Sequence, residues 1–361
     1  MEITLVPLLL PEIQRQFDLS VGNLAWVFNA YGLAVAVGVL LGGLCGDLFN
    51  TRKIFGYGVV FFAAGSLVVA AAESFEVLII GRALQGFGGG IFSPLVPLLL
   101  TRASPEKPGR MLIVWGSIAG YVAAFAPLFY GGFLGEHGWN LAFVLTAIIA
   151  FFAFVILNRT QTADELAPDS NPKADYLALF QARDLWVTFV YVFCTYGSIT
   201  YYLFRLPVWL SSNEVTAASV GLVLSIVWLT FSGFSTLLRN MVDKPHVRMI
   251  MLAAPFLIAA GFPLSYFNEN LFLLVLSSFL VGSGLACSNA PSTQLILRFA
   301  PKGMSAISTS LDITFARLGG IATVAILAET EFAYATPAIF LACMIAACCA
   351  LVACRGLANG P

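Results

Sequence analysis

The chain has 361 residues, of which 59% are hydrophobic and only 10% are charged. A mean hydropathy of +0.90 excludes a soluble globule of this size, because such a globule needs far more charged side chains on its surface. The formal net charge of -1 also gives no basic surface for a nucleic-acid partner.

Eleven apolar runs are close to the roughly 20 residues that an α-helix needs to cross a bilayer core. Those in the first part of the chain cover residues 24–43, 54–72, 77–100, 111–133 and 141–157. Those in the second part cover residues 185–210, 219–238, 249–267, 271–295, 307–328 and 333–353. The opening residues, MEITLVPLLLPEI, resemble half of a further span and lack the basic start of a signal peptide. The sequence therefore predicts an all-α integral membrane protein with about 12 spans, the first incomplete.

The longest polar interval separates these two sets of spans. Its Pro, Asp and Ser residues predict a solvated linker, with a short amphipathic helix around residues 176–182. We therefore predict three parts: an N-terminal helix bundle at 1–157, a cytoplasmic linker at 158–184 and a C-terminal helix bundle at 185–361.

Basic residues set the expected orientation, because loops rich in Lys and Arg stay in the cytoplasm. With the loop at residues 43–53 placed inside, the loops on that side hold most of the bases, and the opposite loops hold mainly acids. We expect a multi-pass protein of the inner (plasma) membrane, with both ends cytoplasmic if the first span is complete upstream.

The segment GGLCGDLFNTRK ends one span with an acid and begins the next with two bases. It resembles the signature between the second and third spans of the major facilitator superfamily at Gly43, Asp47, Arg52 and Lys53. Three other positions depart from that signature. The resemblance implies two six-helix bundles and a cytoplasmic latch that holds them in one conformation. A plain span end with snorkelling bases is the alternative interpretation.

Charged side chains inside predicted spans are costly in hydrocarbon, so each is a functional candidate by default. They are Arg82, Arg205, Asp312 and Arg317, with Glu2 as a possible fifth. The stretch EITLVPLLLP resembles the first-span pattern of drug:proton antiporters, which normally lies mid-membrane. We therefore expect an N-terminally truncated first span, and a fragment, an internal start codon and a degenerate copy remain open.

Arg82 and Gln85 lie in a stretch, LIIGRALQGFGGG, that resembles the fourth-span motif of the superfamily. Residues three apart share one helix face, so Gln85 is also a candidate for the substrate cavity. The resemblance places Arg82 in a proton-coupling network. A buried structural ion pair is the alternative.

The fifth predicted span carries Pro127, Gly131 and Gly132, similar to the motif that distinguishes antiporters. The match is imperfect in sequence and spacing. A mid-helix proline kinks a span and the glycines permit close packing, with or without antiport.

SLDITFARLGG in the eleventh span resembles a pattern of the multidrug branch, with Asp312 where asparagine is common. Arg317 lies five residues further on, so both side chains are candidates to face one cavity. A titratable carboxylate is what proton coupling requires, and Asp312 is therefore a proton-coupling candidate together with Glu2, Arg82 and Arg317.

Tyr201 and Tyr202 are candidates for a cavity that holds flat apolar compounds, although packing between helices explains them as well. Arg205 either attracts an anionic substrate or snorkels to the interface.

The sequence predicts no metal site, since it has no CxxC pair and only two histidines. It has no GxxxxGK[ST] loop for a driving nucleotide, and we expect no cofactor and no enzyme activity. The favoured function is a monomeric secondary transporter that exports small amphipathic organic molecules in exchange for protons by alternating access. The alternatives are a proton symporter for a nutrient or organic acid and a non-transporting or decayed membrane sensor.

Overall fold

The structure is a computed structural model that describes residues 2–96, 99, 120–127, 138–159, 176–238, 247–267, 269–301 and 304–358. Most of the predicted linker and the glycines at 131 and 132 lie outside these residues. Among the residues described, regular secondary structure is helical, as expected for an all-α membrane protein.

The first part of the chain forms α1 (Glu2–Gln16), α2 (Val21–Leu48), α3 (Thr51–Ala70), α4 (Phe75–Phe92) and α7 (Trp139–Arg159). Residues 120–127 are also helical. The second part forms α8 (Tyr176–Gln181), α9 (Arg183–Ser212), α10 (Ala217–Leu238), α11 (Val247–Leu264), α12 (Leu271–Phe299), α13 (Ser305–Leu327), the 3-10 helix η2 (Phe332–Ala335) and α14 (Thr336–Ala358).

Ten helical segments of the described residues are long and apolar enough to cross a membrane. They correspond to ten of the eleven predicted runs, and the remaining run, 111–133, is helical where it is described. The short helix expected around residues 176–182 is present as α8. α1 has 15 residues, fewer than a full span requires.

Polar caps fix where several spans begin. The side chains of Ser20, Asn50 and Ser74 accept hydrogen bonds from backbone N–H groups in the first turns of α2, α3 and α4. Asn270 caps α12 in the same way. Because the first N–H groups of a helix have no acceptor within it, these side chains separate one apolar run from the next.

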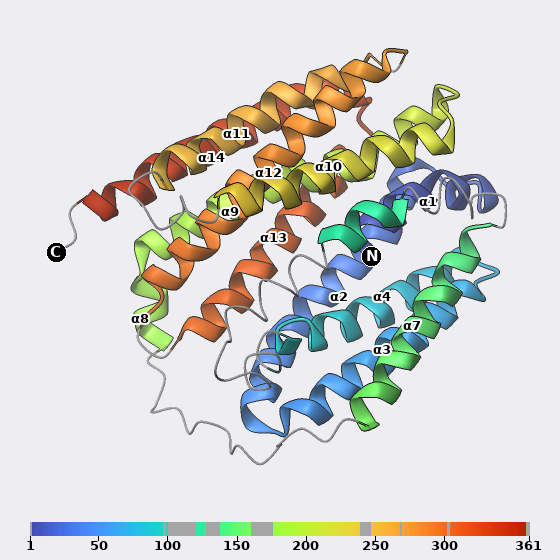
Figure 1. The fold of residues 1–361 in the computed structure, drawn as a ribbon, viewed down its shortest axis with the longest axis horizontal. Helices are drawn as coiled ribbons and strands as arrows, with labels where there is room; N and C mark the ends of the chain where they lie inside the picture. The colour runs from blue at the N-terminus through green and yellow to red at the C-terminus, as the bar shows by residue number, and fades with distance from the viewer. Residues whose placement is uncertain are drawn as a thin grey trace.

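The helices form two groups that meet along α2 and α13 (Figure 1). In one group α4 packs on α2 and α3, and in the other α9 packs on α12, α13 and α14. A Cβ atom on Gly32 would lie 3.1 Å from Ile321, and one on Gly43 would lie 3.1 Å from Ser310. Small residues therefore let α2 and α13 approach closely near the middle of α2 and toward its end.

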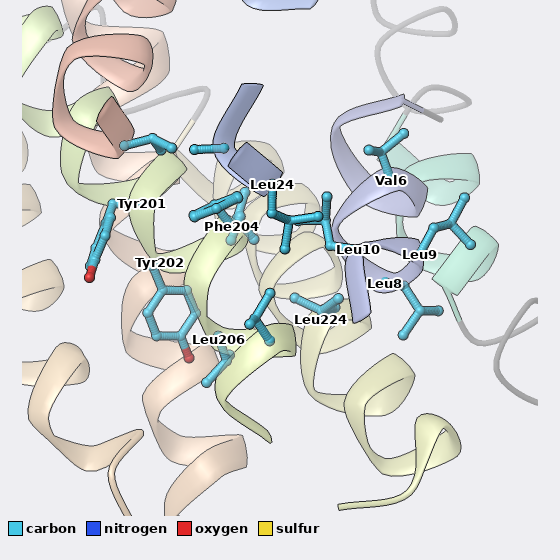
Figure 2. Packing of buried hydrophobic residues seen from close by; sticks show 14 of the residues in the cluster. Val6, Leu8, Leu9, Leu10, Leu24, Tyr201, Tyr202, Phe204, Leu206 and Leu224 are labelled. Atoms are coloured by element: carbon cyan, nitrogen blue, oxygen red, sulfur yellow. The ribbon is translucent and has the colours of Figure 1, made fainter. Parts of the chain in front are cut away.

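An apolar cluster joins the two groups near the start of α2 and the end of α9. Figure 2 shows Leu24 of α2 beside Leu10 of α1 and Phe204 of α9. Leu224 of α10 belongs to the same cluster, which buries these side chains almost completely. The two groups thus share an apolar cluster at this end of the bundle.

Candidate functional site

Arg82 lies in the interior of the first helix group and is 1% exposed. Its Nε donates to the carbonyl oxygen of Val27 at 3.0 Å, and its Nη1 donates to Oε1 of Gln85 at 2.5 Å. The guanidinium also lies over the Tyr31 ring, 4.4 Å from its centroid. The arginine therefore ties α4 to α2 through hydrogen bonds and a cation–π contact.

Gln85 extends this network to α3. Its Nε2 donates to Oγ of Ser66 at 2.8 Å, and that hydroxyl donates to the carbonyl oxygen of Phe62 at 2.8 Å. Gln85 has no exposed surface, and both ends of its amide bind groups within the bundle. The spacing of Arg82 and Gln85 correctly indicated a shared face, and a direct role for Gln85 in substrate contact stays a prediction.

A second polar cluster surrounds Asp312, about two turns into α13. Thr293 of α12 donates to Oδ2 of Asp312 at 3.1 Å. Tyr196 of α9 interacts electrostatically with both Asp312 and Arg317, and its hydroxyl donates to Oδ1 of Asn289 at 2.5 Å. The structure thus brings the two predicted residues of α13 into one cluster, with partners from α9 and α12.

Sequence reasoning missed the partners of Asp312. Asn289 and Thr293 are four residues apart in a span that is otherwise largely apolar, so they share one face of α12. This four-residue spacing was the sequence feature that indicated a polar face on α12. The contribution of Tyr196 depends on how α9 packs on α13, which the sequence does not reveal.

Tyr201 and Tyr202 are fully buried in the second helix group. The Tyr201 hydroxyl donates to the carbonyl oxygen of Leu327 at 3.3 Å, and the Tyr202 hydroxyl shares a hydrogen bond with Ser277 at 2.8 Å. Both rings lie 6.1 Å from the ring of Phe262. These contacts are those of side chains that pack between helices. Arg205, which interacts with Tyr201, is half-buried, and its Nε has no hydrogen-bond partner in the described part of the chain.

The predicted latch segment connects α2 and α3. Gly43 faces Ser310 of α13, in the other helix group, and Asp47 lies in the last turn of α2. Arg52 donates through Nη2 to the carbonyl oxygen of Leu157 at the end of α7. Lys53 is exposed, and its backbone N–H donates to the cap of α3. The side chain of Asp47 lies outside the described residues.

Two further candidates have only partial descriptions. Glu2 is the first residue of α1, and its side chain lies outside the described residues. Pro127 is buried at the end of the described helical stretch 120–127.

One face of α10 carries polar atoms that have no hydrogen-bond partner among the described residues. Ser225 Oγ, Trp228 Nε1 and Ser232 Oγ are buried there and follow one another at intervals of three and four residues. Many other hydroxyls in these helices donate to the carbonyl one turn back, as Ser198 does to Cys194. A Cβ on Gly120 would collide with Ser232, so this face meets the helix at 120–127.

The family model described as Major Facilitator Superfamily matches residues 1–324 of this chain. The "Tetracenomycin C resistance and export protein" of Streptomyces glaucescens is 28% identical over 255 residues, which cover 70% of this chain and 44% of that protein. The "Multidrug resistance protein B homolog" of Mycobacterium tuberculosis is 32% identical over 183 residues, covering 49% of this chain and 34% of that protein. The matches to these relatives span less than half of their length.

The fold is also similar to that of a solved transporter. The crystal structure of the nucleoside transporter NupG aligns with a TM-score of 0.77 and covers 98% of this chain and 94% of its own. The sequences are 14% identical, so this likeness concerns the fold alone.

Proposed function

The chain belongs to the Major Facilitator Superfamily, a family of membrane transporters, and from that premise we propose that it exports small amphipathic organic molecules in exchange for protons. Relatives named for drug resistance and export support the direction and the substrate class. The two helix groups supply the parts for alternating access, in which one bundle rocks against the other around a central site. We further propose a monomer in the inner membrane.

The carboxylate of Asp312 carries the proton-coupling part of this proposal. It lies within a span, where an ionisable side chain is costly and marks an ion pathway. Thr293 supplies a hydroxyl donor to Asp312, and Tyr196 interacts electrostatically both with Asp312 and with Arg317. A proton that binds Asp312 removes its charge and thereby changes its interactions with Thr293 of α12 and Tyr196 of α9, which is how proton binding would bias the conformation.

The segment Gly43–Lys53 is proposed as the cytoplasmic latch. The close approach of Gly43 to Ser310 supports contact between the two bundles at this end of α2. Arg52, which binds the end of α7, keeps the start of α3 in place beside it.

The test is transport in proteoliposomes with a pH gradient of either direction. We expect Asp312→Asn to uncouple substrate movement from the gradient while the protein stays folded. Glu269→Gln, which changes an exposed acid between α11 and α12, is the control and should transport as the wild type does. Full coupling in Asp312→Asn would remove this residue from the mechanism, and uptake of substrate together with protons would establish symport instead.

A further inference from the structure

Glu329 joins the two helix groups at the membrane face opposite the Gly43–Lys53 segment. It lies two residues beyond the end of α13, and α2 begins beside it. Its Oε1 accepts a hydrogen bond from the backbone N–H of Gly22 at 2.7 Å and one from the Ser20 hydroxyl at 3.4 Å. More than 300 residues separate the partners, and they belong to different groups.

The start of α2 is a suitable site for a carboxylate. The first N–H groups of a helix lack acceptors within it and carry a partial positive charge. Ser20 satisfies the N–H of Asn23 at 3.1 Å, and Glu329 satisfies that of Gly22. The interaction is therefore charge-assisted, and it depends on the two groups being in contact.

Gly22 is what permits this approach. A Cβ atom at this position would collide with Oε1 of Glu329. Because the carboxylate is the far end of a flexible side chain, an alanine displaces it without moving the backbone. Gly22→Ala and Glu329→Gln thus weaken one contact from its two sides.

The surrounding contact between the groups is apolar. Leu10 and Leu24 pack against Phe204 and Leu224 just inside this face. Apolar surfaces attract without direction, so this cluster closes the face without selecting a particular alignment. Glu329 supplies a directional charged bond at its rim.

We propose that Glu329, held by Ser20 and Gly22 at the start of α2, is a clasp that favours closure of this face of the transporter. The role deepens the proposed alternating-access function and rests on it. When the bundles separate at this face, the bond is lost and both partners are hydrated, so the bond stabilises only the closed state. A carboxylate at an exposed helix start changes the ratio of the two states by about two- to fivefold.

The test measures access to a buried reporter. Leu224, which is 1% exposed, is replaced by cysteine, and a maleimide too polar to enter lipid is added to the protein in nanodiscs. Labelling is quantified by mass on the peptide that contains residue 224, so the native cysteines do not interfere. Both membrane faces are open to the reagent, and the assay needs neither substrate nor a proton gradient.

We expect Glu329→Gln and Gly22→Ala each to raise the labelling rate of the reporter about two- to fivefold. Glu331→Gln, which changes an exposed acid two residues away, should leave the rate unchanged. An unchanged rate in both clasp variants, or an equal rise in Glu331→Gln, would overturn the proposal. A transport assay that shows no proton-driven export would contradict the proposed function, but it would not change the labelling rates that test the clasp.

Discussion

Replacing Arg82 with lysine separates a structural role for this residue from a role in proton coupling. Lysine keeps the positive charge but presents a single nitrogen in place of the planar guanidinium. The arginine uses Nε and Nη1 at once, on Val27 and Gln85, and also lies over Tyr31. No placement of one ammonium group reproduces all three contacts.

The expected loss follows from these contacts. At least one hydrogen bond of a charged group is lost, worth about 1.5–3 kcal/mol. A weaker cation–π contact over Tyr31 adds up to ~2 kcal/mol, because the site is desolvated. Arg82→Lys should therefore destabilise the protein by about 2–4 kcal/mol. Ser66→Ala removes two neutral hydrogen bonds, the one from Gln85 and the one to the Phe62 carbonyl, and should cost about 0.5–1.5 kcal/mol for each.

The assay is unfolding of the purified protein in one detergent, with transport measured on the same preparations. Arg205→Lys is the matched control, because that arginine is half-buried and no described residue accepts a hydrogen bond from its Nε. Equal destabilisation by Arg82→Lys and Arg205→Lys would refute the reasoning. Arg82→Lys with wild-type stability but an altered pH dependence of transport would show that coupling is the main role.

Two more comparisons test packing and the α10 face. Gly319→Ala should destabilise the protein by about 1–3 kcal/mol in thermal unfolding, because its Cβ would collide with the Phe193 carbonyl. Gly233→Ala, whose Cβ would have no described atom within 4 Å, should be neutral or stabilising. Equal effects of the two substitutions would contradict the close contact of α9 and α13. Trp228→Phe should weaken binding of a transported compound and lower stability only slightly, because the indole N–H has no hydrogen-bond partner among the described residues and phenylalanine keeps most of the apolar contact. Lower stability with unchanged binding would assign Trp228 to packing.

The spans were predictable because the length and apolar composition of a segment are sufficient to identify a membrane span. Arg82 and Gln85 were predictable as a pair, since their spacing fixes a common face. The partners of these residues were not. The alternative interpretation of Arg82, a buried ion pair, requires an acidic partner, whereas the hydrogen bonds described go to a carbonyl and an amide.

The partners of Asp312 were even less predictable from the sequence. From the sequence its nearest charged neighbour is Arg317 in its own helix, yet the hydrogen bond described comes from Thr293 in α12. Which side of α13 meets α12 depends on the packing of three helices. A pattern read along one helix does not contain that information, so the residue type was predictable and its surroundings were not.

The contacts at the two ends of α2 are weak enough for a transporter that must change repeatedly between two conformations. To hold a two-state equilibrium at 99:1 rather than 1:99 takes about 5.5 kcal/mol of difference between the states. Several buried ion pairs between the bundles would approach that value and trap one state. Small residues such as Gly43 allow close contact between the bundles, and the exposed carboxylate of Glu329 at the Gly22 N–H shifts the ratio of the two states only a few-fold. Binding of a substrate or proton therefore supplies enough free energy to reverse that ratio.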